Sequence, residues 1–210
     1  MLATCQIKFV DDSDRRRLES EIPVAKSHFD RMSSQCAEGK VCRFSQNMSY
    51  RLVSALAEFN PDYHCIDDVL YDNDAYEAAC RVSFGQMKKG GDFFINPGMV
   101  DGLTQSAGFA MNGNERTKLE TDVFVNHGWK EFQLFERIRD DCQYCTHVRM
   151  TPTGADGLWS GDISIFTGDR AVALVKGVQV SFQRQCAVSP GADCNVSRSR
   201  VFSAVTSGTS

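Results

Sequence analysis

A carboxylic acid and an amide stand four residues apart near the middle of the chain, at Asp101 and Gln105. In a helix, residues four apart lie on one face, and Gly108, three residues further on, has no side chain to fill the space beside them. A carboxylate can take up or release a proton, and an amide can hold a carbonyl group or a water molecule. The spacing therefore predicts a small acid–base site that points from a helix into open space.

The residues around this pair predict the helix that must carry it. Asn96 is a favourable N-cap, and Pro97 suits the first helical position because its missing N–H would have no partner there. Apolar residues recur at helical spacing on another face of the same segment, at Val100, Leu103, Ala107, Ala110 and Met111. We expect a helix over residues 97–112 with one buried face, and the rest of the chain should surround it.

Most other elements are expected to be strands. Before the central helix, the patterns indicate a strand over 4–10, a helix over 15–32 that Pro23 bends or divides, a helix over 44–59, and strands over 63–71 and 75–84. After it, strand character dominates over 122–138, 144–151, 157–166 and 170–182, and the last of these is apolar on both faces. The prediction is an α+β fold in which an antiparallel sheet wraps around one long helix.

Composition narrows the class of protein. The chain has 210 residues, 42% of them hydrophobic, and a net charge of −4, which fits one globular domain or a compact pair of half-domains. The negative charge argues against non-specific binding to nucleic acid. Neither a signal peptide nor a run of roughly 20 apolar residues is visible. We therefore expect no nucleic-acid or membrane partner, a cytoplasmic location and mostly reduced cysteines.

Motifs for cofactor or metal chemistry are missing from the sequence. Cys142 and Cys145 form a lone C-x-x-C without a second pair, and no phosphate-binding loop, zinc-protease helix motif or nucleophile elbow is present. We expect no cofactor and no metal. His127 is the most tempting additional base, whereas surface or packing roles are expected for His28, His64 and His147.

Several stretches, taken together and in this order, resemble one protein family. They are Met48-Ser49-Tyr50-Arg51-Leu52, Pro97-Gly98-x-x-Asp101 with Gln105, Val125-Asn126-His127-Gly128-Trp129, and the hairpin from Gly161-Asp162 to Asp169-Arg170. With them, residues 3–182 resemble the product-template domain of fungal non-reducing polyketide synthases. The resemblance implies a hot-dog fold, and in this family two hot-dogs stand in tandem as in dehydratase domains.

The family resemblance also implies a chemistry. The tandem hot-dogs enclose a chamber in which a carrier-bound poly-β-ketone is cyclised by aldol chemistry and aromatised, using a histidine from the first half and an aspartate from the second. Asp101 matches the aspartate, whereas the histidine would precede this chain. We accordingly expect residues 1–45 to be the remnant of a first hot-dog with connecting helices, 46–185 to be the second hot-dog, and 186–210 to be a disordered tail.

The site prediction follows from the residues and the resemblance together. Asp101 is the expected acid or base, Gln105 and Asn126 would hold a carbonyl or a water, and His127 is a possible replacement base. Substrate contacts are expected from Phe94, Pro97, Gly108, Phe109 and Trp129. The expected partners are a polyketide, possibly carrier-bound, and a second copy or another chain that supplies the missing half. Two alternatives stay open: a non-catalytic binding module or synthase remnant, and a repurposed isomerase or pericyclase.

Overall fold

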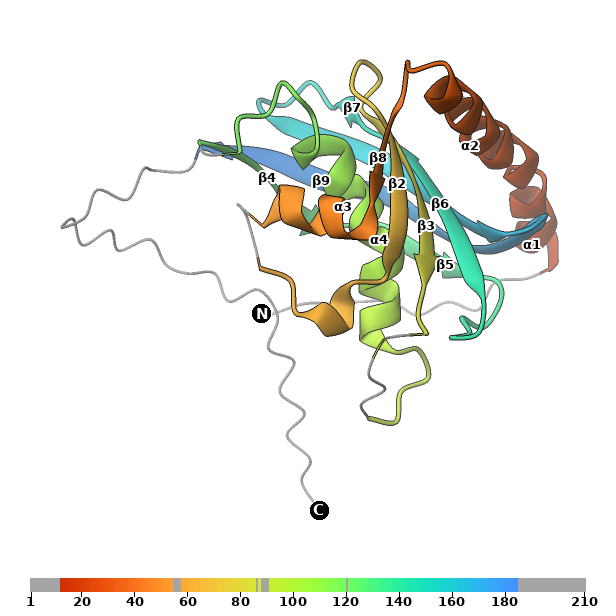
Figure 1. Cartoon of the computed structure of the whole chain (residues 1–210). Helices are drawn as coiled ribbons and strands as arrows, with labels where there is room; N and C mark the ends of the chain where they lie inside the picture. The colour runs from red at the N-terminus through yellow and green to blue at the C-terminus, as the bar shows by residue number, and fades with distance from the viewer. Residues whose placement is uncertain (1–11, 55–57, 86, 88–90, 120, 185–210) are drawn as a thin grey trace.

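The computed structural model describes residues 12–54, 58–85, 87, 91–119 and 121–184, and the helix α4, Pro97–Asn112, runs through its middle (Figure 1). The Asn96 side chain accepts a hydrogen bond of 2.8 Å from the Gly98 N–H, which caps the helix, and Pro97 occupies its first turn. The apolar face from Leu103 to Met111 is buried. The predicted helix and its core-facing side are therefore confirmed.

One antiparallel sheet holds all the strands of the described residues, in the order β1-β2-β3-β6-β8-β9-β4, with β5 paired to β9 and β7 paired to β8. The strands are β1 Cys42–Ser45, β2 Ile66–Asp72, β3 Glu77–Ser83, β4 Asp122–Gly128, β5 Glu131–Leu134, β6 Gln143–Arg149, β7 Thr151–Pro152, β8 Leu158–Thr167 and β9 Arg170–Arg184. The sheet curls around α4 (Figure 1). This is the predicted hot-dog arrangement.

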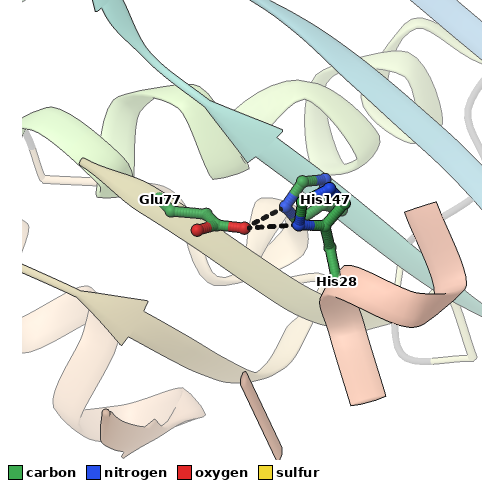
Figure 2. Close-up of side chains that lie close together, drawn as sticks. All are labelled: His28, Glu77 and His147. Carbon is green, nitrogen blue, oxygen red and sulfur yellow. Dashed lines mark hydrogen bonds and ion pairs between the residues drawn. The ribbon is translucent and has the colours of Figure 1, made fainter. Parts of the chain in front are cut away.

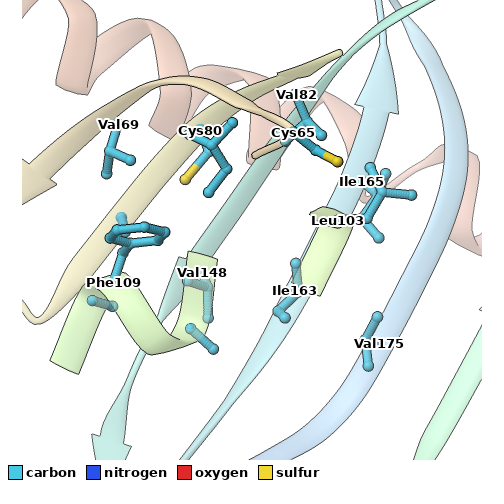
Figure 3. Close-up of a cluster of buried hydrophobic side chains, with 14 of the residues drawn as sticks. Cys65, Val69, Cys80, Val82, Leu103, Phe109, Val148, Ile163, Ile165 and Val175 are labelled. Carbon is cyan, nitrogen blue, oxygen red and sulfur yellow. The ribbon is translucent and has the colours of Figure 1, made fainter. Parts of the chain in front are cut away.

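The main core lies between α4 and the inner face of the sheet. Figure 3 shows Leu103 and Phe109 of the helix against strand residues such as Val69, Val148 and Ile163. Burial of such apolar side chains stabilises the fold by about 1.5–3 kcal/mol each. The packing fixes which side of α4 faces the sheet, and therefore which side is left for other contacts.

A glycine lets α4 lie close to β2. A Cβ atom at Gly102 would lie 2.8 Å from the Cβ of Cys65 and 3.1 Å from the ring of Phe84, closer than side chains normally pack. Only a residue without a side chain permits this contact without a shift. Gly102 thus anchors the turn of the helix that carries the neighbouring Asp101.

The opposite face of the sheet is covered by a second helix. The predicted helix over 15–32 is divided, as expected, into α1, Asp12–Glu19, and α2, Ile22–Ala37, with Pro23 in the first turn of α2. Residues alternate between the two faces of a strand. On β2 and β3, this places Leu70 and Ala79 against α2 and their neighbours against α4.

Two predicted elements are wrong in detail. Within the predicted helix over 44–59, the structure has the end of β1 and the shorter helix α3, Gln46–Val53, while residues 55–57 lie outside the described residues; the short 3-10 helix η1, Pro61–Tyr63, follows. Pairing of Phe44 with Val69 across the sheet overrides the helical pattern there. The predicted strand over 122–138 is split into β4 and β5.

The split of that strand follows from a bend in the 15-residue strand β9. Gly177, with φ of 60°, interrupts the regular strand geometry of β9, and its N–H donates to the Asp162 carboxylate at 2.8 Å. The partner strand must break as well, and Gly128, with φ of 128°, ends β4. β4 then pairs with the far part of β9 and β5 with the near part.

Some predictions concern parts of the chain that lie outside the described residues, namely the strand over 4–10 and the tail over 186–210. The division at 45/46 stays a prediction, although β1 just before it pairs with β2 in the common sheet. In the part of the chain that the structure covers, no helix is long and apolar enough to cross a bilayer.

Candidate functional site

Asp101 and Gln105 meet on the side of α4 that turns away from the sheet. Asp101 is exposed and Gln105 is half-buried. The Gln105 side-chain N–H (Nε2) donates to Asp101 Oδ2 at 2.8 Å. The juxtaposition that their spacing predicts is confirmed, and it holds the carboxylate through one of its two oxygens.

The surroundings of Asp101 change its acidity. Desolvation by nearby protein atoms raises the pKa of its carboxyl group, and the hydrogen bond from Gln105 offsets part of this rise. Because the side chain is exposed, water screens a share of the desolvation. A carboxyl group with a raised pKa is a better proton acceptor when ionised, which is a property of acid–base sites.

Tyr50 of α3 lies beneath the pair and completes a short network. Its hydroxyl donates to Gln105 Oε1 at 2.7 Å and accepts a hydrogen bond of 3.2 Å from the Ile66 N–H. The Gln105 amide also donates to the Tyr63 carbonyl at 3.3 Å. Burial raises the pKa of Tyr50, so its hydroxyl stays protonated near neutral pH.

Aromatic packing keeps Tyr50 in this position. The His64 ring stacks on it with centroids 3.9 Å apart, and Phe109 approaches it edge-on at 6.0 Å. Sequence reasoning gave Tyr50 no role in the site. It stands 55 positions before Gln105 and belongs to no motif with known chemistry, so only the packing of α3 against α4 brings the two together.

The open space expected beside Gln105 is present. Among the residues that the structure describes, no neighbouring atom lies within 4 Å of a Cβ built on Gly108. Near the start of α4, Phe94 is 87% exposed and Pro97 is exposed. Phe109, in contrast, is 5% exposed and belongs to the core under the site. These positions leave Phe94, Pro97 and Gly108 accessible to a ligand, while Phe109 supports the site from below.

The other predicted site residues have partners away from Asp101. The Asn126 side chain accepts a hydrogen bond of 2.7 Å from the Gly128 N–H, and His127 pairs with the Ser181 hydroxyl. Trp129 is 43% exposed and packs near Phe132. Their roles in chemistry stay predictions.

β4, which carries Asn126 and His127, meets α4 at its far end. The Asn112 side chain bonds to the backbone of Phe124 at 2.9 and 3.0 Å. Asn112 lies 11 residues beyond Asp101, about 16 Å along the helix axis. Among the described residues, the structure brings Asp101 together with Gln105 and Tyr50, and it does not bring Asn126 or His127 into that network.

A second cluster of ionisable side chains lies on the other face of the sheet, under α2 (Figure 2). The buried Glu77 accepts a hydrogen bond of 2.6 Å from His147 Nε2, and both of its oxygens lie 2.6 Å from the Arg31 guanidinium. The His28 ring stacks on His147 at 4.8 Å. Sequence reasoning expected surface or packing roles for both histidines and did not connect them to Glu77.

The ligand atoms of His28, Glu77 and His147 lie within 4.8 Å of one another, and two histidines with a glutamate are a ligand set that zinc accepts. The geometry opposes this use. Arg31 already neutralises both oxygens of Glu77, and the imidazole planes are only 13° from parallel, whereas each metal–nitrogen bond must lie in its own ring plane. The cluster is better described as a buried ion pair that fastens α2 to the sheet.

An antiparallel sheet curled around one helix defines the hot-dog class, and solved structures agree. The dehydratase domain from the CurJ module of curacin polyketide synthase has a TM-score of 0.54 and 15% identity, covering 71% of this chain and 52% of that one. The PpsC dehydratase domain from Mycobacterium tuberculosis, in a variant form, has a TM-score of 0.53 and 15% identity, covering 67% and 51%. At this identity, both show the fold alone.

Sequence relatives identify the family. The profile described as polyketide synthase dehydratase N-terminal domain matches residues 36–184, and the chain belongs to this family. The non-reducing polyketide synthase VdtA of Byssochlamys spectabilis is 47% identical over 84% of this chain. For fsr1 of Gibberella fujikuroi the identity is 40% over 82%. The predicted resemblance to product-template domains of fungal non-reducing polyketide synthases is therefore confirmed.

The chain is short beside these relatives. It spans 8% of the length of VdtA and 8% of fsr1. A norsolorinic acid synthase of Dothistroma septosporum, 29% identical over 85% of this chain, is matched over 7% of its length. The match therefore concerns one part of each large synthase.

Proposed function

We propose that the chain is the aspartate-bearing half of a product-template-type unit that promotes aldol cyclisation and aromatisation of a poly-β-ketone. Asp101 is the acid–base group. The observation that carries the proposal is the Asp101 carboxylate held at 2.8 Å by Gln105 on the open side of α4. The naming of the relatives as non-reducing polyketide synthases supports the substrate class.

The chemistry needs one proton acceptor and one hydrogen-bond donor. The Asp101 carboxylate removes a proton from a carbon between two carbonyl groups, and the resulting enolate carbon attacks a third carbonyl to close the ring. Asp101, now a neutral acid, returns the proton to the new alkoxide, and loss of water leads to the aromatic ring. A positioned base contributes about 100- to 10,000-fold to the rate, and Gln105 orients the carboxylate for this exchange.

In the proposal, the missing half of the chamber comes from a second hot-dog. The chain spans about half of each dehydratase domain it resembles, 52% in the case of CurJ. A preceding segment of a longer polypeptide, a second copy of this chain or another protein can supply that half together with the histidine. Sedimentation of the purified chain, alone and mixed with the first half of the VdtA unit, distinguishes a second copy of the chain from a separate first half.

The decisive experiment replaces the carboxylate and leaves the fold intact. Cyclisation of a poly-β-keto thioester is measured for the chain alone and for the chain mixed with the VdtA first half, with Asp101→Asn as the variant. We expect a loss of about 100- to 10,000-fold. Asp156→Asn, which removes an exposed carboxylate from the loop before β8, is the matched control and should keep full activity.

The open alternatives predict other results. A non-catalytic module binds the thioester equally well in both forms and accelerates nothing in either. A chamber that works by shape, as in a pericyclase, keeps its rate in Asp101→Asn and loses it in Gly108→Leu, which fills the space beside Gln105. A loss in His127→Ala as large as that in Asp101→Asn would make His127 the replacement base.

A further inference from the structure

The amide of Gln105 has hydrogen-bond partners on both sides, and they are of opposite kinds. Its oxygen faces the Tyr50 hydroxyl at 2.7 Å, a donor. Its nitrogen faces two acceptors, Asp101 Oδ2 at 2.8 Å and the Tyr63 carbonyl at 3.3 Å. Rotating the amide by half a turn would set its oxygen against both acceptors, with no hydrogen between them. One orientation is therefore strongly favoured.

The Tyr50 hydroxyl is itself oriented. It accepts the Ile66 backbone N–H at 3.2 Å, so its oxygen lone pair is engaged and its single proton must go elsewhere. Two acceptors are within reach: Gln105 Oε1 at 2.7 Å and the Tyr63 carbonyl at 3.1 Å. The shorter distance directs the proton to Gln105. The donor at the start of this series of hydrogen bonds is the backbone N–H of Ile66 in β2, which can only donate. The direction of the following bonds is fixed by it.

We propose that Tyr50 is a positioning residue that locks the Gln105 amide as a donor to Asp101 and so keeps the carboxylate in its proton-accepting form. The inference deepens the proposed function and rests on it for its meaning in catalysis. The amide engages only Oδ2, so it stabilises the anion without occupying Oδ1. In this arrangement Asp101 begins the reaction as the base, and it becomes an acid only after it has taken a proton.

The direct test is an NMR titration of the Asp101 carboxyl carbon in the purified chain without substrate. Tyr50→Phe removes one oxygen atom, takes away the donor that holds Gln105 Oε1 and so loosens the amide, and is expected to raise the pKa of Asp101. Gln105→Met is expected to raise it in the same sense, and adding Tyr50→Phe to Gln105→Met should change nothing more, because both act through one bond. An unchanged titration in Tyr50→Phe overturns the proposal.

The chain offers a matched control. Tyr71 is also buried, and its hydroxyl lies 3.5 Å from the Ala110 carbonyl of the same helix, away from Asp101. Tyr71→Phe should leave the Asp101 titration where it is in the unchanged protein. A shift as large as that of Tyr50→Phe would show a general loosening of α4 and would also overturn the proposal.

Kinetic measurements on Tyr50→Phe distinguish a positioning role of Tyr50 in catalysis from a purely structural one. Tyr50→Phe should lower kcat by about tenfold, with KM unchanged, and shift the acidic limb of the pH profile to higher pH. The titration needs no turnover, so it decides on Tyr50 even if Asp101→Asn shows that the chain is not a cyclase. Conversely, the pKa of Asp101 could shift in Tyr50→Phe while the pH profile of the rate stays the same. In that case the hydrogen-bond network exists but has no role in catalysis, and the catalytic part of the proposal is overturned.

A measurement on the unchanged protein covers the case in which Tyr50→Phe does not fold. In a locked amide, the proton that faces Asp101 has a chemical shift displaced from that of a solvated glutamine amide, and this shift follows the titration of Asp101. Gln105 amide resonances at the positions of a solvated side chain, unaffected by the titration, would contradict the lock.

Discussion

Two carboxylates on opposite sides of the same sheet, Asp101 on α4 and Glu77 under α2, have pKa values shifted in opposite directions. Asp101 lies on the outer side of α4, where desolvation raises its pKa and one neutral amide engages one oxygen. Glu77 is 1% exposed under α2, where burial alone would raise its pKa, but hydrogen bonds and charge from His147 and Arg31 lower it to about 2. The first carboxylate can exchange a proton near the surface, whereas the second is held charged and fully paired.

The difference in hydrogen-bond partners and charge indicates how a carboxylate suited to proton exchange differs from a structural one. A carboxyl group binds and releases protons near neutral pH more readily when only some of its oxygens have hydrogen-bond partners and its pKa is shifted toward neutrality. A buried group that joins two elements is served by full pairing, because an unpaired buried charge is costly. The number and charge of the partners therefore say more than burial alone, since the more buried carboxyl group is the one whose pKa is lowered.

The largest expected contrast comes from removing each carboxylate in turn. Glu77→Gln leaves Arg31 and His147 facing a neutral amide and should lower the free energy of unfolding by about 3 kcal/mol. Asp101→Asn should keep or slightly raise stability, because a carboxyl with a raised pKa is more costly to ionise in the folded state. Urea unfolding at neutral pH measures both. Equal losses in the two variants would remove the distinction.

The same contrast predicts the response to acid. The folded pKa of Glu77, about 2, lies below its ordinary value of 4.5, so its contribution is present above about pH 4.5 and is lost as the pH falls toward 2. The loss amounts to about 3 kcal/mol. Urea unfolding between pH 6 and 2 should show this limb in the unchanged protein and a flatter one in Glu77→Gln.

The histidine His28, beside Glu77, adds to the loss of stability at low pH. Burial and the charge of His147 lower the pKa of His28, so its protonation below about pH 6.5 also favours the unfolded state. The variant His28→Asn should remove the part of the limb near pH 6 and keep the part below pH 4.5. If the free energy of unfolding falls with pH in both variants as it does in the unchanged protein, this cluster is not the source of the acid sensitivity.

The smallest effects come from two glycines of α4 that differ in what surrounds them. Gly102→Ala forces a Cβ to within 2.8 Å of Cys65 and should lower the free energy of unfolding by about 1–3 kcal/mol. Gly108→Ala meets no neighbouring atom within 4 Å in the described part of the chain and should raise the free energy of unfolding by about 0.5–1 kcal/mol through higher helix propensity. Thermal unfolding checks the opposite signs. A loss at Gly108 would show that the space beside Gln105 is filled.

Local rules in the sequence were enough for the central helix. The capping residue Asn96, the proline after it and the apolar spacing up to Met111 depend only on neighbours in the chain, and they predicted the observed limits of α4. The Asp101–Gln105 contact follows from the same helical geometry. Where pairing across the sheet competes with local preference, as at Phe44, the sequence-based prediction was wrong.

The sequence by itself determined the central helix and the acid–amide pair on it, because helical periodicity and capping act over a few residues, and its resemblance to product-template domains implied the hot-dog class. Only the tertiary structure decided the partners of these groups. It brought Tyr50 to Gln105 across 55 positions, and Glu77 to His147 across 70. Such contacts depend on how helices and strands pack, and no spacing along the chain encodes them.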